Sequence, residues 1–449
     1  MAKRYDLVII GAGPAGLMAA KTAGENGLRV ALLERKVNIA EIKRTCAMMF
    51  AIEDNYYFGE RMYFNHKQGM MVFPVNGFTI KYDGPYRNFY GQHLYSPNGR
   101  SCIQLGNYEE QKRKGDEGRL SIVYDKGRLL SGLLKDAEES GVEVFTGVNV
   151  GSIKKMERGV EVKGDDETFD GTFVIAADGI NSRITQILGF NKERTFYGTL
   201  SAIGFYMRRV KLPQPEVFII IMTFDHIYKA PISYSITPSP YADDEYWVYV
   251  GGILDSRLDY LAEKEYLVEK SPFSSWFDHP QVTRQHASVV NLWSPVSEPF
   301  RDNVILVGDA SWTGEAEITG SMMSGWKAAH AVTVALRDDK PNREGVLNYI
   351  DWWKKSFAEL GAKAYLPILG MAITLTEEDI NYLYSLITEP LPYSLDPSKL
   401  SDHMTSILTQ KMPQIQRERP DTMERLQKIA FTPLEKLIAP QIERCFPNR

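Results

Sequence analysis

The sequence predicts an α/β protein in which a parallel-sheet nucleotide-binding domain is interrupted by an antiparallel sheet domain and followed by a helical C-terminal tail. Three patterns predict this arrangement. Apolar runs typical of buried parallel strands occur near the N-terminus, around residue 174 and again around residue 306. Between the last two runs, residues 194–296 alternate as strands with one wet face do. From Asn342 onwards the pattern is mostly helical.

The first apolar strand, Leu7–Ile10, leads directly into Gly-Ala-Gly-Pro-Ala-Gly and then into a helix rich in small residues. Gly11 suits the tight turn, Gly13 lets the backbone approach a pyrophosphate, and Gly16 allows the helix to pack closely on the strand. Ala15 belongs to the same turn. The free N–H groups and the dipole at the start of the helix favour a diphosphate there. This strand, turn and helix form the Rossmann-type dinucleotide-binding fingerprint, and the context distinguishes it from a chance Gly-rich turn.

An acidic residue follows at the spacing expected for a ribose contact. The next strand, Arg29–Leu33, ends in Glu34, about 20 residues beyond the glycines, where a carboxylate can accept a hydrogen bond from a 2′-hydroxyl. Glu34 is therefore predicted to bind the adenosine ribose of a dinucleotide without a 2′-phosphate. The adjacent Arg35 is a further candidate for contact with the cofactor.

The overall composition narrows the class of protein. The chain has 449 residues, of which 44% are hydrophobic and 24% charged, as expected for a globular protein of two or three domains. The net charge of −5 argues against nucleic acid as a partner. Cys46, Cys102 and Cys445 are too few and too scattered for a disulfide framework or a zinc site, so no metal site is expected. We expect no signal peptide and no membrane-spanning segment, and therefore a cytoplasmic protein with at most peripheral membrane contact.

The domain boundaries are expected where the sequence pattern changes. Residues 1–190 are expected to form the first part of the nucleotide-binding domain and residues 299–340 its second part. Residues 191–298 would form the inserted sheet domain that binds the substrate. Residues 341–449 would form the helical C-terminal region.

Two later motifs accompany the fingerprint. In Phe173–Arg183 a buried strand ends in Asp178-Gly179. In Val304–Ala310 another buried strand ends in Gly308-Asp309, and Gly320 and Ser321 follow where a helix is predicted to begin. In this order along the chain, the three motifs resemble the FAD-binding superfamily of aromatic hydroxylases and geranylgeranyl reductases.

The resemblance implies FAD as the cofactor and assigns roles to several residues. Asp309 would accept a hydrogen bond from a ribityl hydroxyl, and the helix after Gly320 would direct its N-terminus at the pyrimidine edge of the flavin, where it favours negative charge. Arg128 or Lys126 matches a position where the family often has an arginine near the pyrophosphate, and the backbone of Val150 would meet the adenine. The implied cofactor contacts are Gly11, Gly13, Ala15, Gly16, Glu34, Arg35, Arg44, Thr45, Cys46, Ala47, Arg128, Val150, Asp178, Gly179, Gly308, Asp309, Gly320 and Ser321.

Three segments resemble the reductase branch of this superfamily. Arg44-Thr45-Cys46-Ala47 is similar to its Lys-Pro-Cys-Gly segment near the flavin, which makes Cys46 a candidate catalytic residue. Ser324–Ala329 is similar to its Ser-Gly-x-x-Ala-Ala helix, and Thr376–Tyr382 is similar to part of its C-terminal region.

Two segments depart from the family pattern. The flavin loop normally carries a proline and a glycine-rich run, whereas residues 311–317 here contain a tryptophan and two glutamates. The reductases also have a Tyr-x-Trp-x-Phe-Pro strand facing the lipid, and the matching strand here is Ser233–Pro238, with one aromatic residue and several hydroxyls. We therefore expect a substrate pocket with polar contacts rather than a purely apolar channel.

Together these features predict an FAD-dependent oxidoreductase that reduces carbon–carbon double bonds of an isoprenoid or a similar apolar or amphipathic substrate. The flavin would supply hydride, and a side chain or water a proton. A monooxygenase acting on an aromatic substrate is one alternative. A flavoprotein that relays electrons to a protein partner, or that has lost FAD and only binds a ligand, is another. The sequence contains no second nucleotide fingerprint, so the external electron donor (NAD(P)H, ferredoxin or an electron-donor protein of another kind) stays open.

Overall fold

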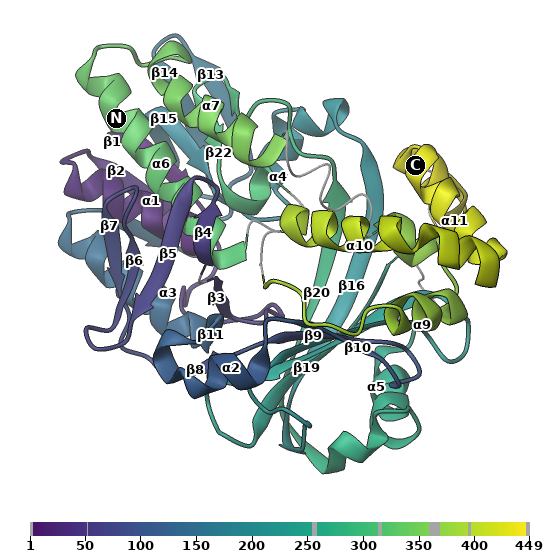
Figure 1. Cartoon of the computed structure of the whole chain (residues 1–449). Helices are drawn as coiled ribbons and strands as arrows, with labels where there is room; N and C mark the ends of the chain where they lie inside the picture. The colour runs from purple at the N-terminus through teal and green to yellow at the C-terminus, as the bar shows by residue number, and fades with distance from the viewer. Residues whose placement is uncertain are drawn as a thin grey trace.

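The computed structural model describes residues 3–51, 53–253, 258–312, 317–358, 369–393 and 397–445. Within these residues the chain forms two large sheets, two small sheets and a helical C-terminal layer. Figure 1 shows the N-terminal strands on one side of the molecule and the last helices of the chain, coloured yellow-green to yellow, on the other.

The first large sheet has the strand order β12-β2-β1-β15-β14-β13, with β22 on the other side of β15 and paired with β21. Its central strands are parallel, so their carboxyl ends share one edge. In register, Val8 of β1 lies beside Val174 of β15, which lies beside Val304 of β22. The strands are β1 (Lys3–Ile10), β2 (Val30–Glu34), β12 (Glu143–Thr146), β13 (Ser152–Met156), β14 (Gly159–Lys163), β15 (Thr168–Ala176), β21 (Phe300–Arg301) and β22 (Val304–Leu306).

Helix α1 (Pro14–Glu25) packs against both α3 (Lys126–Glu139) and α6 (Glu317–Arg337) beside this sheet. The approach of α1 and α6 is very close, because a Cβ added to Gly325 would lie 2.1 Å from the carbonyl oxygen of Ala15. The side chains of the parallel strands are almost fully buried in this core. The predicted fold class, a Rossmann-type parallel sheet with an added antiparallel sheet and a helical C-terminal region, is confirmed.

The second large sheet has the order β10-β9-β17-β18-β19-β16-β20 and is antiparallel except where β9 meets β17. Five of its strands lie in the region expected to alternate. The other two, β9 and β10, come from residues that were expected in the first part of the nucleotide-binding domain. The strands are β9 (Gln92–Tyr95), β10 (Cys102–Leu105), β16 (Phe196–Val210), β17 (Phe218–Phe224), β18 (Pro231–Pro238), β19 (Glu245–Ile253) and β20 (Phe277–Trp293).

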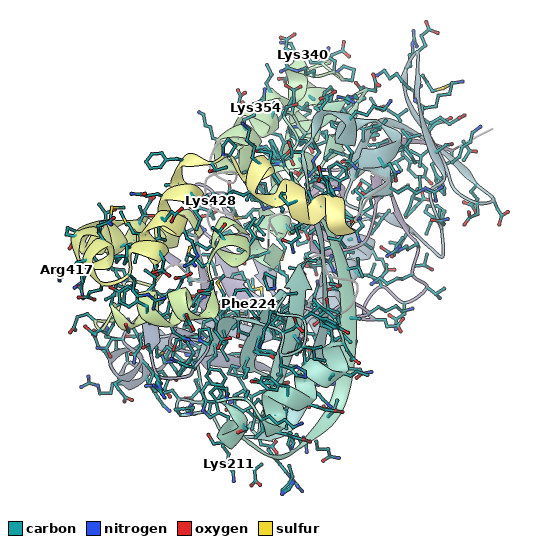
Figure 2. The ribbon with its side chains drawn as sticks, turned by 90° about the vertical axis from the view of Figure 1, so that its right-hand side faces the viewer. Lys211, Phe224, Lys340, Lys354, Arg417 and Lys428 are labelled. Atoms are coloured by element: carbon teal, nitrogen blue, oxygen red, sulfur yellow. The ribbon has the colours of Figure 1, made fainter. Side chains whose placement is uncertain are left out.

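The two faces of this second sheet have different coverings. The outer face, which carries Ile219, Tyr234 and Val248, packs with α5 (Tyr260–Glu269). On the inner face, Leu94 and Ile220 pack under the C-terminal helices α9 (Glu377–Ser385), α10 (Pro397–Glu418) and α11 (Pro420–Phe431). In Figure 2 these helices are yellow, and the labelled Phe224 lies beneath them.

The remaining elements complete the layers around the two large sheets. One small sheet has the order β3-β11-β8 and the other β4-β5-β6-β7. Their strands are β3 (Met49–Ala51), β4 (Glu53–Tyr57), β5 (Glu60–Asn65), β6 (Met70–Phe73), β7 (Phe78–Lys81), β8 (Tyr86–Phe89) and β11 (Ser121–Tyr124). The other helices are α2 (Tyr108–Arg113), α4 (Arg183–Ile187), α7 (Leu347–Trp353) and α12 (Leu434–Cys445). In the described parts of the chain, none of the helices combines the length and apolar character needed to cross a bilayer.

Candidate active site

The fingerprint glycines have different structural roles. Gly11 has φ +99°, and a Cβ there would lie 2.5 Å from the carbonyl oxygen of Ala177. A Cβ on Gly16 would lie 1.8 Å from the carbonyl oxygen of Gly11. Gly13 differs from both, because a Cβ there would meet no atom of the described residues within 4 Å. The space in front of the α1 N-terminus is therefore open at Gly13, as a diphosphate-binding turn requires.

The Glu34 carboxylate is buried at the end of β2 and oriented by backbone donors. One oxygen accepts from the N–H of Ala12 at 2.7 Å, and the other accepts from the N–H of Lys36 at 2.9 Å. Each carboxylate oxygen can accept a further hydrogen bond. The N–H of Val148 donates to the Glu34 carbonyl, and Val150 lies buried two residues further on. Arg35, in contrast, is exposed.

Two basic residues at the start of α3 lie in different surroundings. Burial lowers the pKa of Lys36, the charge of Glu34 opposes this effect and the charge of Lys126 adds to it, so Glu34 and Lys126 both lie within electrostatic reach of Lys36. Arg128 is exposed and lines a pocket of about 420 Å³ together with Arg284 and His286. Both residues stay candidates for the pyrophosphate contact that the family resemblance implies; Lys126 is half-buried, whereas Arg128 is exposed.

Asp178 follows the end of β15, and its carboxylate is used to cap α4. Ser182 Oγ donates to one oxygen at 2.6 Å, and the N–H of Ile184 donates to the other at 3.1 Å. Burial raises the pKa of Asp178, although these hydrogen bonds oppose the shift. Gly179 has φ +84° and no protein atom within 4 Å of an added Cβ. Gly179 can thus border a ligand, whereas Asp178 has a structural role.

The Gly308-Asp309 turn lies where α1 and α6 meet. Gly308 has φ +56°, and its N–H donates to Ser324 Oγ at 2.9 Å. A Cβ on Gly308 would lie 3.3 Å from both Ala15 Cβ and Ser321 Oγ. The structure therefore brings Ala15, Gly308 and Ser321 together, with Asp309 next in the turn.

Helix α6 begins earlier than the sequence analysis expected. Its first residue is Glu317, so Gly320 and Ser321 lie inside the helix rather than at its start. Gly320 was interpreted as the residue before the helix, but it is buried, and tertiary packing outweighs the low helix propensity of glycine. The first residue of α6 is the acidic Glu317. Its negative charge interacts favourably with the positive end of the helix dipole and partly neutralises it.

The segment Arg44–Ala47 lies against the inner face of the second sheet. Arg44 forms a backbone bridge with Ala287 of β20, and the side chain of Thr45 accepts from Trp247 Nε1 at 3.1 Å. Cys46 and Ala47 are half-buried against the cluster that contains Met48 and Trp247. This segment therefore joins the nucleotide-binding part of the chain to the second sheet.

Cys46 has a backbone donor at its sulfur. The N–H of Met48 donates to Cys46 Sγ at 3.4 Å, and Met48 has φ +53°, which is uncommon for a side chain of this kind. Tyr124, which the sequence analysis did not single out, is fully buried with a hydroxyl that has no partner. Burial raises the pKa of Tyr124, and Cys46 and Glu317 are close enough to add to this effect. Only tertiary structure brings these three residues together, so the sequence carried no signal for Tyr124.

The described residues include no group of three or more His, Cys, Asp or Glu side chains arranged to hold a metal ion. The donor set around the Rossmann turn instead fits a dinucleotide: an open glycine before α1, an oriented carboxylate with spare acceptor capacity, and a nearby lysine.

Comparisons with known proteins agree with this geometry. Residues 5–64 match the pyridine nucleotide-disulphide oxidoreductase family, and residues 104–313 match the FAD binding domain family. A digeranylgeranylglycerophospholipid reductase of Methanothrix thermoacetophila is 25% identical over 396 residues, covering 85% of this chain and 90% of the relative. The corresponding protein of Methanococcus vannielii is 24% identical over 426 residues, covering 88% and 94%. The chain is thus similar, over most of its length, to digeranylgeranylglycerophospholipid reductases. It is an FAD-dependent oxidoreductase, as the sequence analysis predicted.

Several solved structures share this fold. A geranylgeranyl bacteriochlorophyll reductase-like protein from Thermoplasma acidophilum has a TM-score of 0.69 at 17% identity, covering 96% of this chain and all of that one. The halogenase PltM has a TM-score of 0.63 at 12% identity, covering 99% and 97%. At these identities the likeness concerns the fold and not the reaction.

Proposed function

We propose that this chain reduces carbon–carbon double bonds in the polyprenyl chain of an amphipathic lipid. The observation that carries the proposal is the position of Arg44–Ala47, which is fixed by Thr45 and Trp247 against the inner face of the second sheet. A substrate lying on that face would meet Cys46, because the Arg44–Ala47 segment joins the nucleotide-binding part of the chain to this face. The named reductase relatives support a lipid with isoprenoid chains as the substrate class.

We propose that FAD is held by the residues that the motifs single out. Gly13 would face the diphosphate, Glu34 would accept from the adenosine ribose, and Lys126 would balance the phosphate charge. Asp309 and the first turn of α6 would border the flavin ring. The bound flavin supplies a hydride to an alkene carbon.

The chain's own residues would position the alkene and supply the proton. We propose Cys46 as the residue that delivers the proton to the second alkene carbon, with its sulfur oriented by the Met48 N–H. The aromatic side chains of Tyr206 and Trp247, which pack with Met48, would exclude water from this side of the site.

A single-turnover experiment tests this function. The FAD-loaded protein is reduced with dithionite under anaerobic conditions and mixed with geranylgeraniol or with a digeranylgeranylglycerol ether lipid. We expect flavin reoxidation together with a mass gain of two hydrogens per reduced double bond. An aromatic monooxygenase would instead require oxygen and add an oxygen atom, and an electron-relay flavoprotein would leave both lipids unchanged.

We also propose that the chain is cytoplasmic with peripheral contact to the membrane that supplies the lipid. Cosedimentation with phospholipid vesicles is the test, and recovery of all the protein in the supernatant at low salt would contradict it.

For the domain organisation we propose the expected division at residues 190, 298 and 340, with β9 and β10 contributed to the inserted sheet. Limited proteolysis should then cut first near these boundaries.

A further inference from the structure

The inner face of the second sheet contains a row of small side chains that crosses four adjacent strands. In register, Ser233 of β18 lies beside Gly251 of β19, Gly251 beside Ala202 of β16, and Ala202 beside Ser288 of β20. Residues paired directly across strands point to the same face of a sheet. We call this row of small side chains the small-residue floor.

The next row on this face forms one wall of the floor. Ser235 lies beside Tyr249, and Tyr249 beside Gly204. A Cβ on Gly251 would lie 2.1 Å from the Tyr249 hydroxyl, so the Tyr249 side chain extends along its strand over Gly251. Large aromatic side chains on this part of the inner face thus come from β19, and β18 contributes small ones.

Three hydroxyl side chains line β18 on the inner face. Ser233, Ser235 and Thr237 alternate with Tyr234 and Ile236, which point into the outer core. Thr237 has 0% exposure, and among the described residues its hydroxyl has no hydrogen-bond partner. A buried hydroxyl without a partner is destabilising, so its presence requires an explanation.

Strand β18 lies between the two coverings of the inner face. On one side, Trp247 of β19 holds Thr45 of the Arg44–Ala47 segment. On the other side, Ile220 of β17 packs with the C-terminal helices. A substrate that reaches Cys46 across this face must therefore pass over the hydroxyl side chains of β18.

We propose that Ser233, Ser235 and Thr237 bind an oxygen-bearing group of the substrate, such as a hydroxyl, ether or ester oxygen, while its apolar chain lies across the small-residue floor. This inference rests on the proposed function and specifies the substrate as an oxygenated, amphipathic polyprenyl lipid. A pure hydrocarbon would leave the buried Thr237 hydroxyl without a partner. An oxygen atom at this position would supply the missing partner and fix the register of the chain relative to Cys46.

Binding of two saturated chains tests the inference without turnover. Phytanol and phytane share one C20 skeleton and differ in a hydroxyl group. The FAD-loaded wild type and the variants Thr237→Val and Ser235→Ala are titrated with each chain in the same detergent micelles, so micelle partition cancels when affinity ratios are compared between proteins. We expect wild type to prefer phytanol, and each variant to lose about three- to tenfold of that preference, the effect of one hydrogen bond.

A matched control is available on the other face of the sheet. Thr223 of β17 pairs with Ile232, which belongs to the outer core, so Thr223→Val makes the same exchange away from the floor. We expect this variant to keep the wild-type preference. Thr237→Val should be at least as stable as wild type, because it removes a hydroxyl without a partner.

Three results would overturn the inference: wild type that binds neither chain or binds both equally, a preference that survives in Thr237→Val and Ser235→Ala, and an equal loss in Thr223→Val. Failure of the proposed function has a different signature. In that case wild type keeps its phytanol preference, but the dithionite-reduced enzyme leaves geranylgeraniol unchanged.

Discussion

Gly13 allows the bound cofactor to be tested separately from the fold. A Cβ at Gly13 meets no atom within 4 Å in the described parts of the chain, and its φ of −77° suits any residue, so the fold tolerates a larger side chain there. We expect Gly13→Val to fold normally but to purify without the yellow flavin spectrum, because the side chain would occupy the diphosphate position. Gly132→Ala, a helical glycine whose Cβ would lie 3.7 Å from the Lys81 carbonyl oxygen, is the control and should keep its FAD. Full flavin occupancy in Gly13→Val would reject the assignment.

Cys46 is the second residue at which a single exchange separates two roles. Serine keeps the size of the side chain but is a much weaker acid than a thiol. If Cys46 donates the proton, the turnover of Cys46→Ser should be about 10²–10⁴-fold lower than that of wild type, the range found for general acid catalysis. Flavin reduction by dithionite should stay normal in the same variant. A turnover within about threefold of wild type, below ~1 kcal/mol in the barrier, would show that Cys46 only packs.

At the scale of elements, Asp379 connects the C-terminal helices. Its carboxylate has 0% exposure and caps α9 through Thr376, while Thr422 and Arg425 of α11 donate to it at 2.5 and 3.0 Å. Burial alone would raise its pKa, but the bonds from Thr422 and Thr376 and the charge of Arg425 hold the pKa below its usual range. The resulting stability is present above the unfolded-state pKa and is lost as the pH falls through the folded-state pKa.

We expect Asp379→Asn to lower the free energy of unfolding by about 3 kcal/mol, because it removes a buried partner of Arg425 and weakens the cap of α9. Urea unfolding measures the loss, and hydrogen exchange should show faster exchange in α9 and α11 than in β1. Asp421 also pairs with Arg425 but is exposed, so Asp421→Asn is the control and should unfold at the same urea concentration as wild type. Equal behaviour of the two variants would contradict the role of Asp379.

The elements show which parts of the structure the sequence could predict. The parallel strands and the Gly11–Gly16 turn were predictable, because apolar runs and glycine spacing are local signals that the fold uses directly. The start of α6 was placed four residues late, because Gly320 reads as a helix breaker until its burial is known. The pairing of β9 with β17 was missed, because a short strand carries no sign of a partner more than a hundred residues away.

For the candidate site too, the sequence predicts local motifs but not contacts between distant segments. The residues on the Rossmann turn follow from local motifs, and their surroundings have the expected geometry. The position of Arg128 and the proximity of Tyr124 to Cys46 depend on how separate segments meet. The resemblance implies a role at the start of α3 without choosing between Lys126 and Arg128, and only tertiary structure shows that Lys126 is half-buried and Arg128 exposed.

At the scale of the whole molecule, the second large sheet is completed by two strands, β9 and β10, that precede the inserted region in the sequence. Strands β9 and β10 leave the first domain and complete the second sheet, which buries His93 of β9 at 0% exposure. Neither ring nitrogen of His93 has a hydrogen-bond partner in the part of the chain that the structure describes, and its aromatic neighbours include Tyr95 and Tyr108. Burial lowers the pKa of His93 to about 4. The histidine is therefore neutral in the folded protein at pH 5, whereas it is protonated in the unfolded chain.

This difference gives the stability of the molecule a dependence on pH. The unfolded chain binds a proton at a pKa of about 6.5, so between pH 6.5 and pH 4 it binds more protons than the folded protein, and stability falls as the pH falls. For His93 the loss is about 2 kcal/mol by pH 5. His93→Phe removes the titrating group and breaks no hydrogen bond. The free energy of unfolding is measured in urea at pH 7.5 and at pH 5. We expect the loss between these two pH values to be about 2 kcal/mol smaller in His93→Phe than in wild type. His330→Gln, on the exposed side of α6, should keep the wild-type difference, and a wild-type difference in His93→Phe would show that the acid sensitivity arises elsewhere.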